Sequence, residues 1–174
     1  VRVDFHKLNP TKNYYSDKRV LLLIRDPRDV AVSFYFHKRY RTRTYHGSLP
    51  EFLRCRMLGI RKVIRFYNTW YAQRDVPEAF HVLRYEDLHT DAYQSITDTL
   101  KFLDFTHTEP ELVRRALKFA AFKNMRKLER KNAKLTTRAW LKPTNVKDIR
   151  SYKVRRGKVH GFYDYLTDAD LEYV

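Results

Sequence analysis

RVLLLIRDPRDVAVSFYF, residues 19–36, joins an apolar run to a well-marked helix start. Residues 21–24 are three leucines and an isoleucine. Such a short unbroken run predicts a strand that is covered on both faces, as parallel strands usually are. Asp26 can cap the next helix, Pro27 fits its first position because no N–H partner is needed there, and Asp29 favours the positive end of its dipole. The segment therefore predicts a strand that leads directly into a helix.

Arg25 ends this strand, and Ser33 lies about two turns along the predicted helix. An arginine beside the free N–H groups of a helix N-terminus combines a fixed cation with oriented dipoles, which favours a phosphate or a sulfate. Ser33 would add a hydroxyl donor. From these residues alone a structural interpretation stays open, in which Arg25 only pairs with Asp26 or Asp29 and Ser33 only packs.

The composition indicates one folded, strongly basic domain. The chain has 174 residues, 43% of them hydrophobic and 15% aromatic, which is enough for a core, and we expect a single domain over residues 1–174. Thirty-six Lys and Arg against 20 Asp and Glu give a formal net charge of +16. This charge predicts an anionic partner, which the charge alone leaves open among nucleotide, acidic glycan, membrane surface and nucleic acid.

Other features narrow the class of protein. The one cysteine, Cys55, excludes an intramolecular disulfide and a thiolate metal cluster, which is compatible with a cytoplasmic protein. No stretch approaches the roughly 18 apolar residues of a membrane span, and residues 1–10 lack the core of a signal peptide. The chain begins at Val1 without a methionine and stops just after a helix-start signal at residues 167–170, so we expect a fragment of a longer protein.

The signals that follow residue 36 alternate between helix and strand. Ser48 and Glu51 match a capping box, and apolar residues at helical spacing predict one long helix from there to about residue 71. Residues 80–85, FHVLRY, predict a second strand, and a helix is expected over residues 91–103. This order is typical of α/β proteins with a parallel sheet, whose sites form at the carboxyl ends of the strands.

The C-terminal third adds further cations. A helix is expected from residue 109 through 119, a short and very basic segment follows to about residue 134, and residues 135–152 predict a loop or lid. In the stretch after it, two arginines precede Gly157, which places two cations beside a flexible backbone whose N–H groups can approach an anion closely. A plain basic loop is the alternative for this segment alone.

Three separated segments together resemble the sulfotransferases that use 3'-phosphoadenosine 5'-phosphosulfate (PAPS). IRDPRDVAVSFY (24–35) is similar to that family's 3'-phosphate-binding strand and helix, RYEDL (84–88) to its second-strand signature, and RRGKVHGFYDYLT (155–167) to its C-terminal RKGxxGxW-type loop. SLPEFL and AAFKNM lie between them in the same order. The resemblance spans nearly the whole chain and implies an α/β fold of three layers with a parallel sheet, related to the P-loop NTPases.

The resemblance implies a binding role for seven residues. Those that would hold the 3'-phosphate are Arg25, Ser33, Arg155, Arg156 and Gly157. Tyr85 and Phe122 would lie at the adenine. These roles fit the chemistry, because the nucleotide is strongly anionic while its base favours an aromatic wall. No metal is implied.

His6 is the residue that the resemblance implies as general base. It follows a strand-like stretch and lies nineteen residues before Arg25. A neutral imidazole suits proton removal from an acceptor because its pKa lies close to the operating pH. A surface histidine without a catalytic role is the alternative.

The family's phosphosulfate-binding strand, loop and helix, which carry a catalytic lysine, would precede Val1. The resemblance therefore implies a fragment that lacks this first unit. We predict that the intact enzyme transfers the sulfuryl group from PAPS to a hydroxyl or amine of a small-molecule or glycan acceptor. Two alternatives stay open: a non-catalytic nucleotide-binding remnant of this fold, and a basic nucleic-acid-binding domain, although we expect no nucleic-acid partner. The sequence indicates neither the acceptor nor the oligomeric state.

Overall fold

The computed structural model describes residues 11–132 and 142–174. At its centre a parallel pair of strands, β1 (Arg19–Ile24) and β2 (Ala79–Arg84), aligns Arg19 with Ala79 and Ile24 with Arg84. The Tyr85 N–H extends this ladder by donating to the Ile24 carbonyl oxygen over 2.8 Å. The predicted α/β fold with a parallel sheet is confirmed, and both strands end at the same edge.

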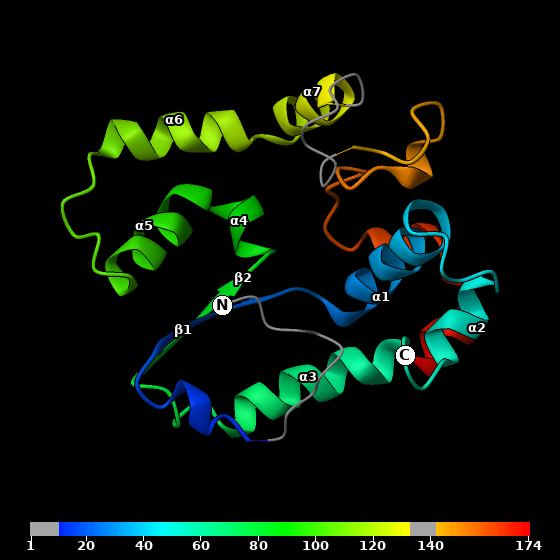
Figure 1. The fold of residues 1–174 in the computed structure, drawn as a ribbon, viewed down its shortest axis with the longest axis horizontal. Coiled ribbons are helices and arrows are strands. Elements are labelled where there is room, and N and C mark those ends of the chain that lie inside the picture. Colours follow the sequence, from blue (N-terminus) through cyan, green and yellow to red (C-terminus); the bar gives the residue numbers. More distant parts are fainter. Residues whose placement is uncertain (1–10, 133–141) are drawn as a thin grey trace.

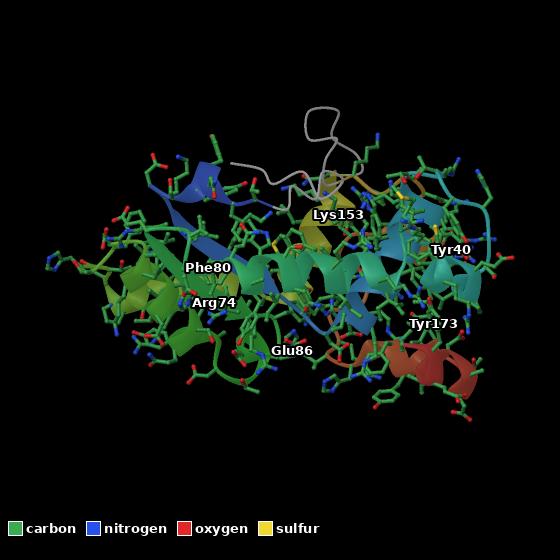
Figure 2. All side chains as sticks on the ribbon, turned by 90° about the horizontal axis from the view of Figure 1, so that it is seen from below. Tyr40, Arg74, Phe80, Glu86, Lys153 and Tyr173 are labelled. Atoms are coloured by element: carbon green, nitrogen blue, oxygen red, sulfur yellow. The ribbon has the colours of Figure 1, made fainter. Side chains whose placement is uncertain are left out.

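Helices cover opposite faces of β2 (Figure 1). On one face Trp70 of α3 (Ile60–Ala72) stacks on Phe80, with ring centroids 6.0 Å apart. Phe80 is labelled in Figure 2. On the other, Phe102 of α5 (Ala92–Phe102) stacks on His81 at 5.2 Å. Successive residues of a strand point to opposite faces, so β2 lies between two helical layers.

Helix α1 (Pro27–Phe36) starts as predicted. The Asp26 carboxylate accepts a hydrogen bond of 2.9 Å from the Arg28 N–H, and Pro27 is the first helical residue. A π-helical turn (His37–Arg41) continues the helix. Because α1 follows β1 without a loop, Arg25 is held between a strand end and a helix N-terminus.

The single long helix predicted from residue 48 to 71 is wrong. The Ser48 capping box is present, but it starts a short helix, α2 (Leu49–Arg54), and α3 begins only after Gly59. A Cβ atom at Gly59 would lie 2.1 Å from the Leu53 carbonyl oxygen, so the break depends on a close backbone approach that only glycine allows. Phe52 and Leu53 of α2 and Ile60 of α3 lie in the same core. Met57, Ile64 and Tyr71, which continue the helical spacing, are exposed.

The structure describes seven further elements. They are a 3₁₀ turn (Asn13–Tyr15), α4 (Asp87–Thr90), α6 (Pro110–Ala120), α7 (Phe122–Asn132), 3₁₀ turns at Ile149–Ser151 and Gly161–Asp164, and α8 (Asp168–Tyr173). The short basic segment after residue 121 is thus a regular helix. Within the described ranges, no helix is long and apolar enough to cross a membrane.

The main core lies beside the sheet rather than on it. Its buried members come from α1, α2, the start of α3 and the C-terminal segment: Ala31, Val32, Tyr35, Phe36, Phe52, Leu53, Ile60, Phe162 and Leu166. The prediction that β1 is covered on both faces is wrong, because Leu21 and Leu23 are exposed. Helix α5 packs on β2, where Leu83 is buried, and leaves this face of β1 open.

Candidate functional site

A cavity of about 750 Å³ opens at the carboxyl ends of the strands. Its walls come from α1, α4 to α7 and the segment between residues 153 and 165. All seven predicted binding residues line it: Arg25, Ser33, Tyr85, Phe122, Arg155, Arg156 and Gly157. The tertiary structure therefore brings four separate segments of the chain to one place.

Arg25 is anchored on three sides. Its Nη2 donates to Asp29 Oδ2 over 2.9 Å and to the Lys158 carbonyl oxygen over 2.8 Å. Its guanidinium carbon lies 4.2 Å from the centroid of the Tyr85 ring, close enough for a cation–π contact. The buried Nε has no hydrogen-bond partner among the described residues. The structural pairing with Asp29 thus exists, but it leaves an unused donor on a fixed cation beside the cavity.

Asp29 links this cation to the C-terminal segment. The residue is only 4% exposed, and its Oδ1 accepts a 2.9 Å hydrogen bond from the Phe162 N–H. The i, i+4 spacing from Arg25 allowed the ion pair to be considered from the sequence, whereas the bond to Phe162 spans 133 positions and has no local signal. A buried carboxylate with both oxygens occupied holds the two sides of the site together.

Two adjacent arginines come from the C-terminal segment. The guanidinium carbon of Arg155 lies 3.8 Å from the centroid of the Phe36 ring, and burial lowers the pKa of this side chain from its ordinary value. Arg156 forms an ion pair of 2.7 Å with Asp164. Both arginines donate to the hydroxyl of Tyr165, a cavity residue that we did not predict. This end of the cavity is strongly positive.

Gly157 has a positive φ of 61° and touches Phe122. A Cβ atom there would lie 2.5 Å from the ring carbon Cδ2 of Phe122, so both the backbone conformation and the contact require glycine. The Phe122 side chain is 40% exposed at the first residue of α7. The loop backbone and this aromatic ring therefore form one continuous wall.

The opposite side of the cavity is largely apolar. The residues that line it from α4 to α7 include Leu88, Ala92, Ile96, Leu117, Ala120, Ala121 and Met125. Tyr85 stands between the two sides, half-buried, and burial raises the pKa of its phenol so that it stays neutral. Ser33 is exposed on the cavity side of α1. The arrangement suits a ligand that is anionic at one end and aromatic at the other.

Glu129 of α7 holds the loop that carries the arginines. It is fully buried, and its two carboxylate oxygens accept hydrogen bonds of 2.8 Å from the backbone N–H groups of Lys153 and Val154. It also pairs with Arg41 at 3.1 Å. A glutamate in a basic helix indicated no such role in the sequence, because its partners are distant in the chain.

His6 lies outside the described residues, as does the first part of the predicted loop or lid, residues 135–141. No group of three or more His, Cys, Asp or Glu residues that could hold a metal occurs in residues 11–132 and 142–174. The use or absence of a metal stays a prediction.

Residues 5–174 match the family model of the sulfotransferase domain. The chain belongs to the sulfotransferase family. A 3-beta-hydroxysteroid sulfotransferase of Cavia porcellus is 32% identical over 169 residues, which cover 92% of this chain and 55% of that relative. The family predicted from the sequence is thus confirmed.

Solved structures share the fold of this sulfotransferase chain. Retinol dehydratase in complex with androsterone and the inactive cofactor PAP matches with a TM-score of 0.70 at 20% identity, over 93% of this chain and 46% of that one. A mouse sulfotransferase complexed with PAP matches with a TM-score of 0.68 at 16% identity, over 89% and 54%. The chain spans about half the length of the relatives and structures that it matches.

Proposed function

We propose that the protein is a PAPS-dependent sulfotransferase and that its cavity binds the 3'-phosphate and adenine end of the donor. One observation carries the proposal: seven residues from four separate segments line a single cavity, positive at one end and apolar at the other. A bisphosphorylated adenine nucleotide has this same polarity. Both solved structures named above contain PAP, which supports the same ligand class.

The residues divide the binding between them. Arg25, with its unused Nε donor, and the Ser33 hydroxyl approach the phosphate from the strand end and α1. Arg155 and Arg156 approach it from the C-terminal segment. Charge-assisted hydrogen bonds from guanidinium groups to phosphate are about twice as strong as neutral ones, so this end fixes the position of the donor. Tyr85 and Phe122 would contact the adenine.

The donor supplies a sulfuryl group bonded to an activated phosphate oxygen. His6 would take the proton of an acceptor hydroxyl or amine, a task that suits a neutral imidazole. The nucleotide-binding residues contribute by orientation, since a fixed donor holds its reactive end in one place relative to the acceptor.

We propose a small organic molecule as the acceptor. The relative of Cavia porcellus is named for a hydroxysteroid, and retinol dehydratase was solved with androsterone, a steroid. Transfer of radiolabelled sulfuryl groups by the full-length protein, with steroid and glycan acceptors compared, tests this directly. Nucleotide binding without transfer to any acceptor would favour the non-catalytic remnant instead.

The decisive binding experiment measures how Arg25→Ala changes the affinity for each of two nucleotides. We expect the affinity for 3'-phosphoadenosine 5'-phosphate (PAP) to fall about 10- to 100-fold, since one charged hydrogen-bonding group is worth roughly 1.5–3 kcal/mol. Affinity for adenosine 5'-monophosphate, which lacks the 3'-phosphate, should change little. Isothermal titration calorimetry measures both.

Two further variants make this experiment conclusive. Ser33→Ala removes an exposed hydroxyl of the cavity without leaving a buried charge unpaired, so it tests the same phosphate with less risk to folding. Arg61→Ala removes an exposed arginine of α3 outside the cavity and controls for net charge. Equal losses for both nucleotides in Arg25→Ala and Ser33→Ala would contradict the proposed site.

A further inference from the structure

Tyr165 lines the same cavity but was not among the seven predicted residues. It follows the 3₁₀ turn Gly161–Asp164, and its ring packs edge-on against Phe36 of α1, with centroids 5.0 Å apart. Since Phe36 belongs to the buried core, the position of the Tyr165 ring is determined by packing. Its hydroxyl is therefore presented from a rigid support.

This hydroxyl lies between the two arginines of the C-terminal segment. Nη1 of Arg155 and Nη1 of Arg156 both donate to the Tyr165 oxygen, the latter over 3.1 Å. The guanidinium carbons lie 5.0 Å and 5.5 Å from the centroid of the tyrosine ring. Two neighbouring cations repel each other, so a shared acceptor and a shared ring offset part of that repulsion and keep both groups at the cavity.

The hydroxyl hydrogen of Tyr165 has no hydrogen-bond acceptor among the described residues. A phenol oxygen accepts through two lone pairs and donates one hydrogen. Both acceptor positions are used by the arginines, and no acceptor for the hydroxyl hydrogen occurs in the part of the chain that the structure describes. Although burial raises the pKa of Tyr165, the hydrogen bond from Arg156 and the charge of Arg155 outweigh it and lower the pKa, which makes the hydroxyl a better donor.

We propose that Tyr165 is a further phosphate-binding residue: its hydroxyl holds Arg155 and Arg156 side by side and donates its own hydrogen to the bound phosphate. The inference rests on the proposed function, since it takes the anion in this cavity to be the 3'-phosphate of the nucleotide. A phenol suits the position better than a carboxylate, because it accepts from both guanidiniums without cancelling their charge or repelling the anion. Asp164, by contrast, engages Arg156 through a different nitrogen, Nη2.

The test is Tyr165→Phe, which removes only the hydroxyl and keeps the ring that packs on Phe36. Calorimetry with PAP and adenosine 5'-monophosphate measures the contribution of the 3'-phosphate in wild type and variant. We expect about ten-fold weaker binding of PAP, equivalent to roughly 1.4 kcal/mol, with less than about two-fold change for the monophosphate. Tyr163→Phe is the matched control, because Tyr163 is exposed and lies outside the cavity.

The possible results distinguish an error in the role of Tyr165 from an error in the proposed function. Wild-type protein that binds the two nucleotides equally would overturn the proposed function itself. If wild type discriminates between them, an unchanged or tighter affinity of Tyr165→Phe for PAP would overturn the role of Tyr165. Equal losses for both nucleotides would also overturn it, since they would indicate a structural effect. Thermal unfolding of each variant is measured first, and the calorimetry is done at a temperature at which all variants are folded.

Discussion

Asp29 is buried, yet its two carboxylate oxygens serve different parts of the chain. One oxygen accepts from the Arg25 guanidinium and the other from the Phe162 N–H. Removing the carboxylate would take away the charge partner of Arg25 and the acceptor of the Phe162 N–H. Individual side chains at the cavity thus connect the strand end to the C-terminal segment.

His37, at the C-terminal end of α1, is the residue at which the free energy of unfolding is expected to depend on pH near neutrality. Burial, followed by the charges of Arg41, Lys153 and Lys38, lowers the pKa of its imidazole, while its ring stacks on Phe34. The unfolded chain, with an ordinary pKa of about 6.5, then binds more protons than the folded chain. The contribution of His37 to stability is present above about pH 6.5 and lost as pH falls through the lowered pKa.

Urea denaturation between about pH 5 and pH 7 measures this effect. We expect the free energy of unfolding to fall toward the acidic end, and His37→Gln to remove part of that slope. His107→Gln serves as the control because His107 is exposed. If His37→Gln leaves the pH dependence of the free energy of unfolding unchanged, burial of His37 does not cause that dependence.

Helix α7 supports the binding loop through one buried ion pair. Glu129 joins the helix to Arg41 of the π-helical turn and to the backbone N–H groups of residues 153 and 154. The next three residues are Arg155, Arg156 and Gly157, so α7 determines where two cations enter the cavity. Phe122 at the start of the same helix touches Gly157, which gives the loop a second attachment.

Glu129→Gln should lower the free energy of unfolding by about 3–5 kcal/mol, because it removes the carboxylate charge of a buried ion pair and offers the two N–H groups only one carbonyl oxygen. Urea denaturation measures the change. Glu111→Gln, which removes an exposed carboxylate of α6, should cost less than about 1 kcal/mol. Similar losses for the two variants would contradict the importance of the buried pair.

Across the whole molecule, apolar side chains are buried to different extents in the main core and in the sheet. The main core packs α1 and α2 against the C-terminal segment, whereas Leu23 of β1 is 55% exposed. Since buried apolar surface is the main source of stability, we expect the side of the molecule that supports the cavity arginines to be the more stable one.

Two truncations compare these regions. Phe52→Ala, at a fully buried position, should lower the free energy of unfolding by about 3–5 kcal/mol. Leu23→Ala should lower the free energy of unfolding by less than about 1 kcal/mol, because about half of the leucine is already exposed to solvent. Chemical denaturation of both variants tests the assignment, and a larger loss at Leu23 would contradict it.

Local signals predicted much of the fold. The cap at Asp26, the capping box at Ser48 and the two strands depend on residues within a few positions of one another, and all were found as predicted. The break at Gly59 was missed because the apolar spacing runs through it. Glu129 and Tyr165 were missed because their partners are fixed by contacts that no local pattern records.

By itself the sequence determined the α/β class, the family and seven residues that line one cavity, because strand and helix signals are local and the family's motifs are short and ordered. Only the tertiary structure decided how those residues are held. It joined Arg25 to the C-terminal segment through Asp29, and it placed one tyrosine hydroxyl between two arginines. Such bonds depend on distances between segments far apart in the chain, which packing sets and spacing in the sequence does not.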